Sequence, residues 1–484
     1  MNIKQSLAAT TLSVCFAFFN QANAAVTAVS GDPTLLGTTN IGLPNYGYQK
    51  SEFFITGKAR SFAPTKPQTT DGKWSIKTVD SKDFKTRMVV YRPSDATKFN
   101  GTVIVEWLNV SGGTEAGSSW IMAHTELIRS GYAWVGVSAQ KAGIDGGGIN
   151  YVGLPLNLKL LNGFRYGSLK HPGDKYAYDM FMQVGSSIKT PSGVNPLAGL
   201  SVKRVIGLGE SQAADFLLTY VNALAPTQKV FDGFFIQSRL HGSADLAAPQ
   251  TTGSSINFAS RPVVQVRNDL NVPVMMVQAE TDLTVLGSYA DRQPDSTNFR
   301  LWEMAGTGHA DRYVSNVGIT DGGSDLSVLD VVENRSALPV LVTCDKPINA
   351  GPQHFIVKAA ISALDKWLRT GVAAPYADRI EMNPATKTIV RNGFGIALGG
   401  IRTPYVDAPI ATLSGDGQTP GVFCALYGTT DLFDSTQLAS LYPNHATYVS
   451  AVDASSENAV NNGFLLEADA ALIKTWARNS DIGN

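Results

Sequence analysis

Residues 202–218 have the sequence VKRVIGLGESQAADFLL, which predicts a strand, a sharp turn and a helix in direct succession. The first part is a short run of β-branched and other apolar residues, which is typical of a buried strand. The turn falls at the segment GESQA, residues 209–213. Beyond it, alanine, phenylalanine and leucine recur with helical spacing to about residue 224. We therefore expect Ser211 to lie at the apex of a strand–turn–helix unit.

A serine in this position has two interpretations. It is either a nucleophile held in a strained backbone with its Oγ directed away from the sheet edge, or the N-cap of the following helix. A nucleophile needs small residues two positions before and after it. Gly209 and Ala213 meet this need, although Ala213 carries one methyl group more than the usual glycine. Several other Gly-x-Ser sequences in the chain lack the flanking strand and helix, so the surroundings favour Ser211.

The composition is that of a globular protein without an electrostatic preference for nucleic acid. The chain has 484 residues, of which 44% are hydrophobic, enough for a large core in one domain with insertions or in two domains. Lysine and arginine total 39, and aspartate and glutamate total 40, so the formal net charge is −1. This balance supplies no basic excess to attract nucleic acid or an anionic membrane.

The N-terminus has the pattern of a signal peptide. Lys4 precedes an apolar stretch at 7–19, and the sequence Ala-Asn-Ala at 22–24 fits a cleavage site between small residues. The apolar stretch is too short for a comfortable membrane span, and no second long apolar run follows. We expect residues 1–24 to be removed and the mature chain, without a stable membrane span, to reach the periplasm or the extracellular space. An uncleaved N-terminal anchor is the alternative.

Two cysteines, Cys344 and Cys424, remain in that mature chain. An exported protein matures in an oxidising compartment, where cysteines tend to pair. We expect a disulfide between them, with two separately buried thiols as the alternative.

Outside the central unit, the chain alternates between predicted strands and helices, which is typical of a mostly parallel sheet with helices on its faces. Further strands are predicted at 53–59, 74–91, 101–108, 132–138, 233–238, 272–279 and 299–304. Helices are predicted at 120–129, 176–188 and 355–369. A polar turn at 80–83 is expected to interrupt the second strand. We interpret 25–370 as one domain with a lid-like insertion at about 139–175, and 371–484 as a C-terminal extension packed on it.

A serine hydroxyl is a poor nucleophile at neutral pH, so it needs a histidine to take its proton and an acid to orient that histidine. Asp282 follows the predicted strand 272–279, and His309 follows the next strand in the sequence AGTGHAD. The carboxyl ends of parallel strands meet at one edge of a sheet, so we expect both side chains to approach Ser211. A surface carboxylate and an ordinary loop histidine are the alternatives.

Two further features belong to the same sheet edge. Glu280 lies nearer the strand end and is the alternative acid. The strand 101–108 is followed by the sequence NVSGG, where the backbone N–H of Val110 or Ser111 would form an oxyanion hole together with that of Gln212; a plain tight turn is the alternative. The sequence has no metal-ligand motif or phosphate-binding loop, so we expect neither a metal nor a cofactor.

The order serine, aspartate, histidine along the chain is that of α/β-hydrolases. The chain also resembles a bacterial family of alpha/beta hydrolase domain proteins over nearly its whole mature length. The resemblance is carried by VEWLNVSGG (105–113), GESQ (209–212), ETD (280–282), AGTGHAD (305–311), GGIRTP (399–404) and GFLL (463–466). It implies an α/β-hydrolase fold, with Ser211, Asp282 and His309 as the catalytic triad.

From these features we expect an exported serine hydrolase that cleaves a carboxylic ester through an acyl-enzyme. Its substrate would be a small-molecule or polymeric ester. An amidase, a peptidase or a lactonase with the same triad is the enzymatic alternative, and a non-catalytic binding protein on a hydrolase fold is the other. The sequence leaves the substrate and the oligomeric state open.

Overall fold

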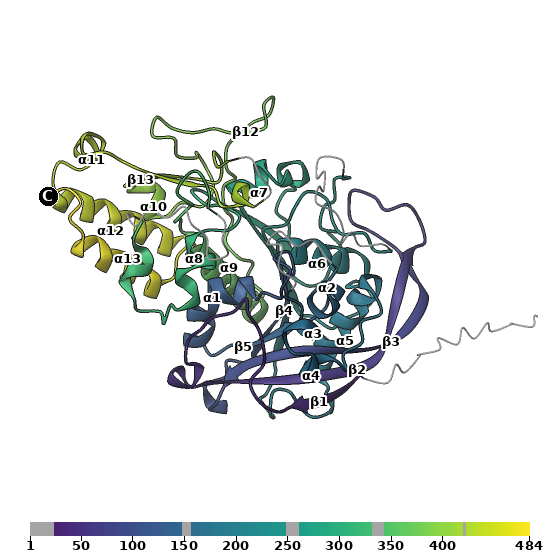
Figure 1. Cartoon of the computed structure of the whole chain (residues 1–484). Helices are drawn as coiled ribbons and strands as arrows, with labels where there is room; N and C mark the ends of the chain where they lie inside the picture. Colours follow the sequence, from purple (N-terminus) through teal and green to yellow (C-terminus); the bar gives the residue numbers. More distant parts are fainter. Residues whose placement is uncertain (1–23, 148–155, 248–260, 332–342, 420–422) are drawn as a thin grey trace, which may run out of the picture.

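The computed structural model describes residues 24–147, 156–247, 261–331, 343–419 and 423–484. The predicted signal peptide therefore lies, except for Ala24, outside the described residues. The centre of the molecule is a ten-stranded sheet with the strand order β10-β9-β8-β7-β4-β5-β3-β2-β1-β6 (Figure 1). Its strands are β1 (Ala25–Val29), β2 (Tyr48–Pro64), β3 (Ile76–Pro93), β4 (Thr102–Trp107), β5 (Ala133–Val137), β6 (Ser192–Gly193), β7 (Arg204–Glu210), β8 (Gly233–Gln237), β9 (Val274–Ala279) and β10 (Phe299–Met304).

The sheet has a parallel part and an antiparallel part. From β5 through β4, β7, β8 and β9 to β10, every neighbouring pair is parallel. Beyond β5 the pairs β5–β3, β3–β2 and β2–β1 are antiparallel, and only the short β6 returns to a parallel pairing. The prediction of a mostly parallel sheet is confirmed, and the strands β4, β7, β9 and β10 that lead into the candidate site belong to its parallel part.

The predicted polar turn at 80–83 is wrong, because β3 runs without interruption from Ile76 to Pro93. Residues 80–83 pair in regular register with β2, and the register shift comes just before them, where Ser61 pairs with Asp80 and Phe62 pairs with Thr78, so that Val79 is skipped. Residues 81–83 are exposed on this long two-stranded ribbon. Because successive side chains of a strand point to opposite faces, both sides of the ribbon meet solvent here, and a polar run does not require a turn.

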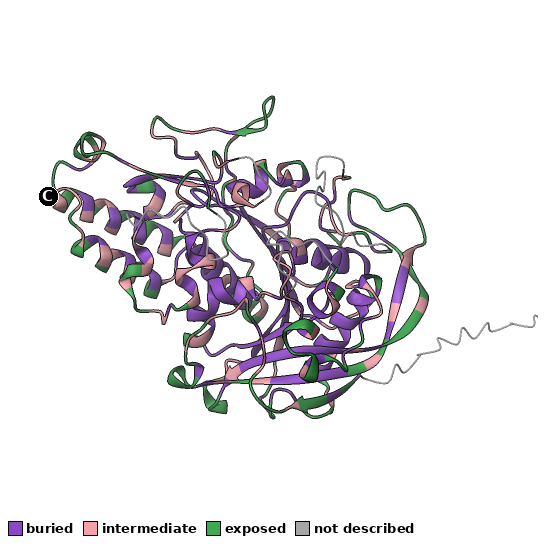
Figure 2. Ribbon diagram, viewed as in Figure 1, coloured by how far each residue is buried: buried purple, intermediate pink, exposed green. Residues whose placement is uncertain are grey.

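Helices cover both faces of the sheet, as Figure 1 shows around β4. The predicted helices are confirmed within a few residues: α1 (Ser118–Arg129) and α9 (Gln353–Thr370) lie on one face, and α5 (Ala177–Lys189) and α6 (Gln212–Ala223) lie on the other. Alternate residues of each central strand enter opposite cores. Trp107 packs against Phe181 and Phe216 on the α5–α6 side, whereas Trp134 packs against Trp120 on the α1 side. Figure 2 shows the resulting buried layers.

The described part of the segment 139–175 packs on the antiparallel half of the sheet. It contains α2 (Lys141–Asp145), α3 (Leu158–Leu161) and α4 (Gly163–Tyr166). Ile144, Leu158 and Tyr166 form a small core with Phe54 of β2. Residues 148–155 lie outside the described part of the chain, so the lid-like role remains a prediction.

Residues after α9 cover the edge of the sheet. Ile401 forms a parallel bridge with Met304 of β10, and the indole N–H of Trp302 donates to the Pro375 carbonyl at 2.9 Å. These contacts pair backbone groups at the C-terminal end of β10, the edge strand, and so shorten the row that is open to another chain. The elements of this segment are β11 (Met382–Asn383), β12 (Thr388–Ile389), α10 (Pro404–Asp407), β13 (Ala411–Ser414), β14 (Thr429–Leu432), α11 (Ser435–Leu441), α12 (His445–Asn461) and α13 (Glu467–Asn479).

A buried carboxylate, Asp469 of α13, joins this segment to the helices next to the sheet. It accepts hydrogen bonds from Arg129 of α1 at 3.0 and 3.1 Å, and its Oδ1 lies 3.5 Å from the Nζ of Lys358 of α9. The side chains of Asp469 and Lys358 are 0% and 3% exposed, so water screens this contact weakly.

Replacing Asp469 with alanine should lower the free energy of unfolding by about 3–5 kcal/mol, because the buried Lys358 loses its counter-charge. Asp453→Ala is the matched control: Asp453 pairs with Arg478 in the same region, but both side chains are substantially exposed, and we expect a loss of less than about 1 kcal/mol. Urea unfolding of both variants measures the difference. Equal losses would show that the buried pair contributes no more than a surface pair.

Candidate active site

Ser211 lies between the last residue of β7 and the first residue of α6, with φ 56° and ψ −124°. A positive φ is rare for a residue with a side chain and marks a strained backbone. A Cβ at Gly209 would lie 2.7 Å from the carbonyl oxygen of Ala213, so only glycine fits the close approach of strand and helix. The Ser211 side chain makes no capping hydrogen bond to α6. The geometry therefore departs from the N-cap interpretation.

The side chains of Ser211, His309 and Asp282 form a continuous series of hydrogen bonds. Ser211 Oγ lies 2.9 Å from His309 Nε2, and His309 Nδ1 lies 2.6 Å from Asp282 Oδ1. All three residues are buried. Asp282 comes from the short helix α7 (Glu280–Thr284) that follows β9, and His309 comes from the loop that follows β10. The three residues predicted from the sequence thus lie together at the carboxyl edge of the parallel strands.

The Asp282 carboxylate is held in a fixed orientation. Its Oδ2 accepts the backbone N–H of Ala279 at 2.6 Å, while Oδ1 faces the histidine. The hydroxyl of Ser288 donates to the Asp282 carbonyl at 2.8 Å and holds the turn from the other side. A carboxylate constrained in this way would fix both the orientation and the tautomer of the imidazole.

Glu280, the alternative acid, lies away from the histidine side chain. Its carboxylate accepts backbone N–H groups of Gly306 at 2.6 Å and Gly415 at 3.0 Å, and it pairs with Arg391 at 2.8 Å. Glu280 therefore connects the acid turn, the histidine loop and the C-terminal segment. Of the two carboxylates weighed from the sequence, only Asp282 contacts His309 directly.

The loop after β4 is a narrow turn closed by reciprocal backbone hydrogen bonds between Asn109 and Ala116, both at 2.9 Å. Within it, the N–H of Ser111 donates to Asn109 Oδ1 at 2.7 Å. Among the described residues, no hydrogen bond involves the backbone N–H of Val110 or that of Gln212. Of the oxyanion donors predicted from the sequence, Val110 and Gln212 therefore retain a donor for a substrate, and the Ser111 donor is already used.

Charge around His309 favours its protonated form. Burial alone would lower the pKa of the imidazole, but Asp282, by charge and hydrogen bond, and Glu210, by charge, together raise that pKa above its ordinary value. Glu210 precedes the serine, and its Oε1 lies 3.7 Å from His309 Nε2. Sequence reasoning missed Glu210. Its position beside Ser211 is the only signal in the sequence, and that position does not say whether the side chain points toward the histidine.

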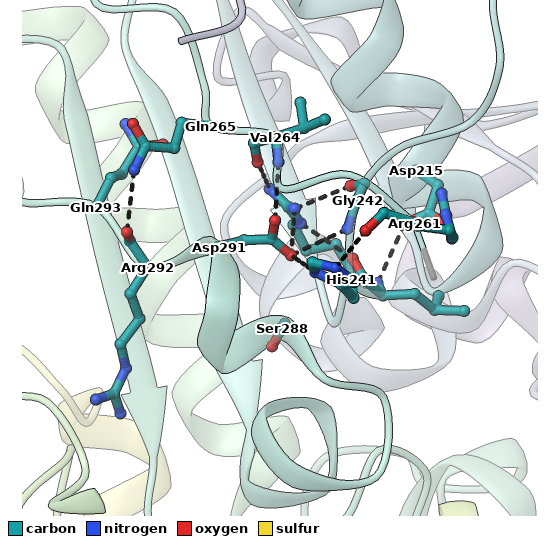
Figure 3. Close-up of polar contacts among 12 residues, drawn as sticks. Asp215, His241, Gly242, Arg261, Val264, Gln265, Ser288, Asp291, Arg292 and Gln293 are labelled. Carbon is teal, nitrogen blue, oxygen red and sulfur yellow. Dashed lines mark hydrogen bonds and ion pairs between the residues drawn. The ribbon is translucent and has the colours of Figure 1, made fainter. Parts of the chain in front are cut away.

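A second polar cluster supports the neighbouring loops (Figure 3). His241 lies with Nδ1 2.8 Å from Asp291 Oδ2 and Nε2 2.8 Å from the Arg261 carbonyl oxygen. Arg261 in turn pairs with Asp215 of α6 at 2.8 Å. These contacts connect α6 with the loops after β8 and β9. Both ring nitrogens of His241 are therefore held by structural contacts.

The expected disulfide between Cys344 and Cys424 is present, with a Cα–Cα distance of 5.6 Å. It closes a loop beside the histidine. Two residues beyond Cys424, the Leu426 carbonyl accepts the backbone N–H of Ala310, which directly follows His309, at 3.0 Å. Cys344 packs in the same small core as Tyr427, with Ala310 at its border. The disulfide therefore braces one wall of the histidine loop.

Removing this disulfide with the pair Cys344→Ser and Cys424→Ser should lower the free energy of unfolding by about 4 kcal/mol, because the cross-link spans 80 residues of sequence. Turnover should fall as well, since the Leu426 contact with the histidine loop loosens. Thermal unfolding and a hydrolysis assay of the double variant measure the two effects. The comparison is with wild-type protein kept without reductant, so that its disulfide is intact. If the double variant has the same melting temperature as this protein, the bracing role is contradicted.

Within the described residues, no group of histidine, cysteine, aspartate or glutamate side chains has an arrangement that would hold a metal ion. In the same part of the chain, none of the helices combines the length and the apolar character that a membrane span requires.

The fold and the site place this protein in a class: α/β proteins with a nucleophile elbow at the carboxyl edge of a parallel sheet. The model of the alpha/beta hydrolase domain family matches residues 20–475. The chain belongs to this family and is a hydrolase. The family relationship inferred from the sequence motifs is confirmed.

Solved structures with likeness to this chain include two esterases. A glucuronoyl esterase from Solibacter usitatus is 12% identical, with 58% of this chain and 81% of that chain covered and a TM-score of 0.29. Acetyl xylan esterase 1 from a Thermoanaerobacterium species is 9% identical, with the same coverage of 58% and 81% and a TM-score of 0.29. Likeness at this level does not bear on the substrate. A search of curated proteins found no match to this sequence.

Proposed function

We propose that this protein is an exported serine hydrolase that cleaves a carboxylic ester, with Ser211, His309 and Asp282 as its catalytic triad. The observation that carries the proposal is the unbroken hydrogen-bond series from Ser211 Oγ through the imidazole to Asp282. The strained backbone of Ser211 adds to it, since such strain is found where a nucleophile is held for reaction.

The reaction would proceed in two halves. Ser211 Oγ attacks the ester carbonyl carbon while its proton passes to His309 Nε2, and the tetrahedral intermediate then breaks its bond to the alkoxide oxygen. The imidazolium gives its proton to the departing alcohol, and the acyl group stays bound to Ser211 as an acyl-enzyme. Water, deprotonated by the same imidazole, attacks the acyl carbonyl and releases the carboxylic acid, and the proton returns to Ser211. Asp282 holds the imidazole throughout.

The backbone N–H groups of Gln212 and Val110 would bind the oxyanion of the tetrahedral intermediate. Donors of this kind contribute about 3 kcal/mol each to acyl transfer, because they are oriented before charge develops. The amide of Asn109 supports this arrangement, since it donates to the Glu210 carbonyl at 3.2 Å and so joins the β4 loop to the elbow.

The proposal of export has separate support. The N-terminal sequence has the pattern of a signal peptide, and the Cys344–Cys424 disulfide fits an oxidising compartment such as the periplasm or the extracellular space. N-terminal sequencing of protein recovered outside the cytoplasm, with Ala25 as the expected first residue, tests this part.

A fluorophosphonate probe tests the catalytic part. We expect the probe to label Ser211, identified by peptide mass spectrometry, and the protein to hydrolyse p-nitrophenyl esters faster than lactones or anilides of the same acyl group. Faster cleavage of anilides or lactones would favour an amidase, peptidase or lactonase with the same triad. Failure of folded protein to react with the probe would favour a binding protein on a hydrolase fold.

A further inference from the structure

Glu210 is a buried carboxylate directly beside the candidate nucleophile, and the reaction described above does not use it. Its side chain is 8% exposed, and its Oε1 lies 3.7 Å from His309 Nε2, the nitrogen that faces Ser211. Within the described part of the chain, no lysine or arginine forms an ion pair with Glu210. The nearby group that acquires a positive charge is therefore the imidazole itself.

The position of this carboxylate is fixed by a neighbour. The amide of Asn109 donates to Glu210 Oε2 at 3.0 Å, which leaves Oε1 directed toward the histidine. That hydrogen bond needs an acceptor but no charge, because a glutamine oxygen would serve equally well. Burial makes the anionic form of Glu210 costly unless a positive group compensates it, and neither of its hydrogen-bond partners, Asn109 and Ser118, carries a charge.

We propose that Glu210 is a second carboxylate partner of His309, which stabilises the imidazolium formed when Ser211 loses its proton. The inference rests on the proposed function. Asp282 would then stabilise the positive charge of the imidazolium through its hydrogen bond to Nδ1. Glu210 would stabilise the same charge from the Nε2 side, without accepting the proton of Ser211. Glu210 is thus a positioning residue that acts through His309.

Electrostatics of the surrounding groups agree with this role. Burial and the charge of Asp282 raise the pKa of Glu210, whereas the nearby His309 and hydrogen bonds from Asn109 and Ser118 favour the carboxylate. Glu210 is accordingly most stable as an anion when His309 is charged. The titratable and charged groups that act on this pair are Asp282, Asp215, Glu106 and Tyr427.

The pH dependence of the reaction of Ser211 tests the proposal. His309 must be neutral to accept the serine proton, so reactivity falls as the pH drops through the imidazole pKa. Glu210→Gln keeps the oxygen that Asn109 needs and removes the charge that raises this pKa. We expect the pH midpoint of fluorophosphonate labelling to move to lower pH, with the rate at high pH within about tenfold of the wild type.

Two further variants separate charge from damage to the fold. Glu210→Asp keeps the charge but withdraws it by one methylene, so its midpoint should lie between those of the wild type and Glu210→Gln. Asp365→Asn neutralises a buried carboxylate that pairs with Arg204 at the start of β7, the opposite end of the strand from Ser211. Its midpoint should equal that of the wild type even where its melting temperature falls.

A direct titration completes the test without any turnover. In protein labelled with 15N-histidine, the ring resonances of His309, assigned by comparison with His309→Gln, should titrate at lower pH in Glu210→Gln than in the wild type. If the probe fails to label the wild type, the proposed function is wrong. If the probe labels Ser211 but the midpoint and the titration are the same with and without the Glu210 charge, the role of Glu210 is refuted and the triad stands.

Discussion

Replacement of Ser211 by alanine should lower kcat for ester hydrolysis by about 10^6-fold, because Ser211 supplies the hydroxyl that His309 Nε2 contacts. The residual rate would come from substrate binding and the oxyanion donors alone. The melting temperature should change little, since the substitution removes one oxygen whose hydrogen-bond partner is the imidazole. Steady-state hydrolysis of a p-nitrophenyl ester and thermal unfolding measure the two quantities.

A matched control for this variant is Ser187→Ala. Ser187 is also buried and also lies two residues after a glycine, but its hydroxyl donates to the Val184 carbonyl at 2.7 Å in α5. We expect full activity from it, within experimental error. Turnover by Ser211→Ala comparable with that of the control would remove Ser211 from the mechanism and, with it, the serine hydrolase proposal.

The second large effect is expected at the acid. Asp282→Asn preserves the size of the side chain but places an amide beside His309 Nδ1, which favours the wrong tautomer and leaves the imidazolium without its anion. We expect kcat to fall by about 10^4-fold while KM stays nearly constant. A decrease of less than tenfold would show that Asp282 does not orient the imidazole during the reaction.

Glu280→Gln distinguishes the two acids weighed from the sequence. Glu280 is fully buried against Arg391 and the backbone of Gly306 and Gly415, so its neutralisation should reduce the free energy of unfolding by about 3 kcal/mol. Its kcat should remain within about tenfold of the wild type at temperatures where it is folded. Loss of kcat comparable with that of Asp282→Asn, in folded protein, would make Glu280 part of the catalytic machinery.

Local sequence patterns predicted the individual strands and helices of this fold, because these elements depend mainly on the spacing of apolar residues along the chain. The β-branched run before Ser211 and the helical spacing after it indicated the elbow, and the alternation of strands and helices indicated the parallel sheet. The same logic missed α12, whose residues include many small and polar side chains without a clear apolar stripe. It also placed a turn at 80–83, because a ribbon exposed on both faces and a turn have similar polarity.

The sequence by itself determined that a serine, an aspartate and a histidine follow the ends of three strands, β7, β9 and β10, and that two cysteines were available to pair. Tertiary structure decided which carboxylate meets the imidazole. Asp282 and Glu280 lie two residues apart in one turn of α7, so their side chains leave in different directions, and only packing of the histidine loop and the C-terminal segment separates their partners. The proximity of Glu210 to His309 likewise depends on the tertiary structure, because the loop after β10 reaches back past β9 and β8 to the end of β7.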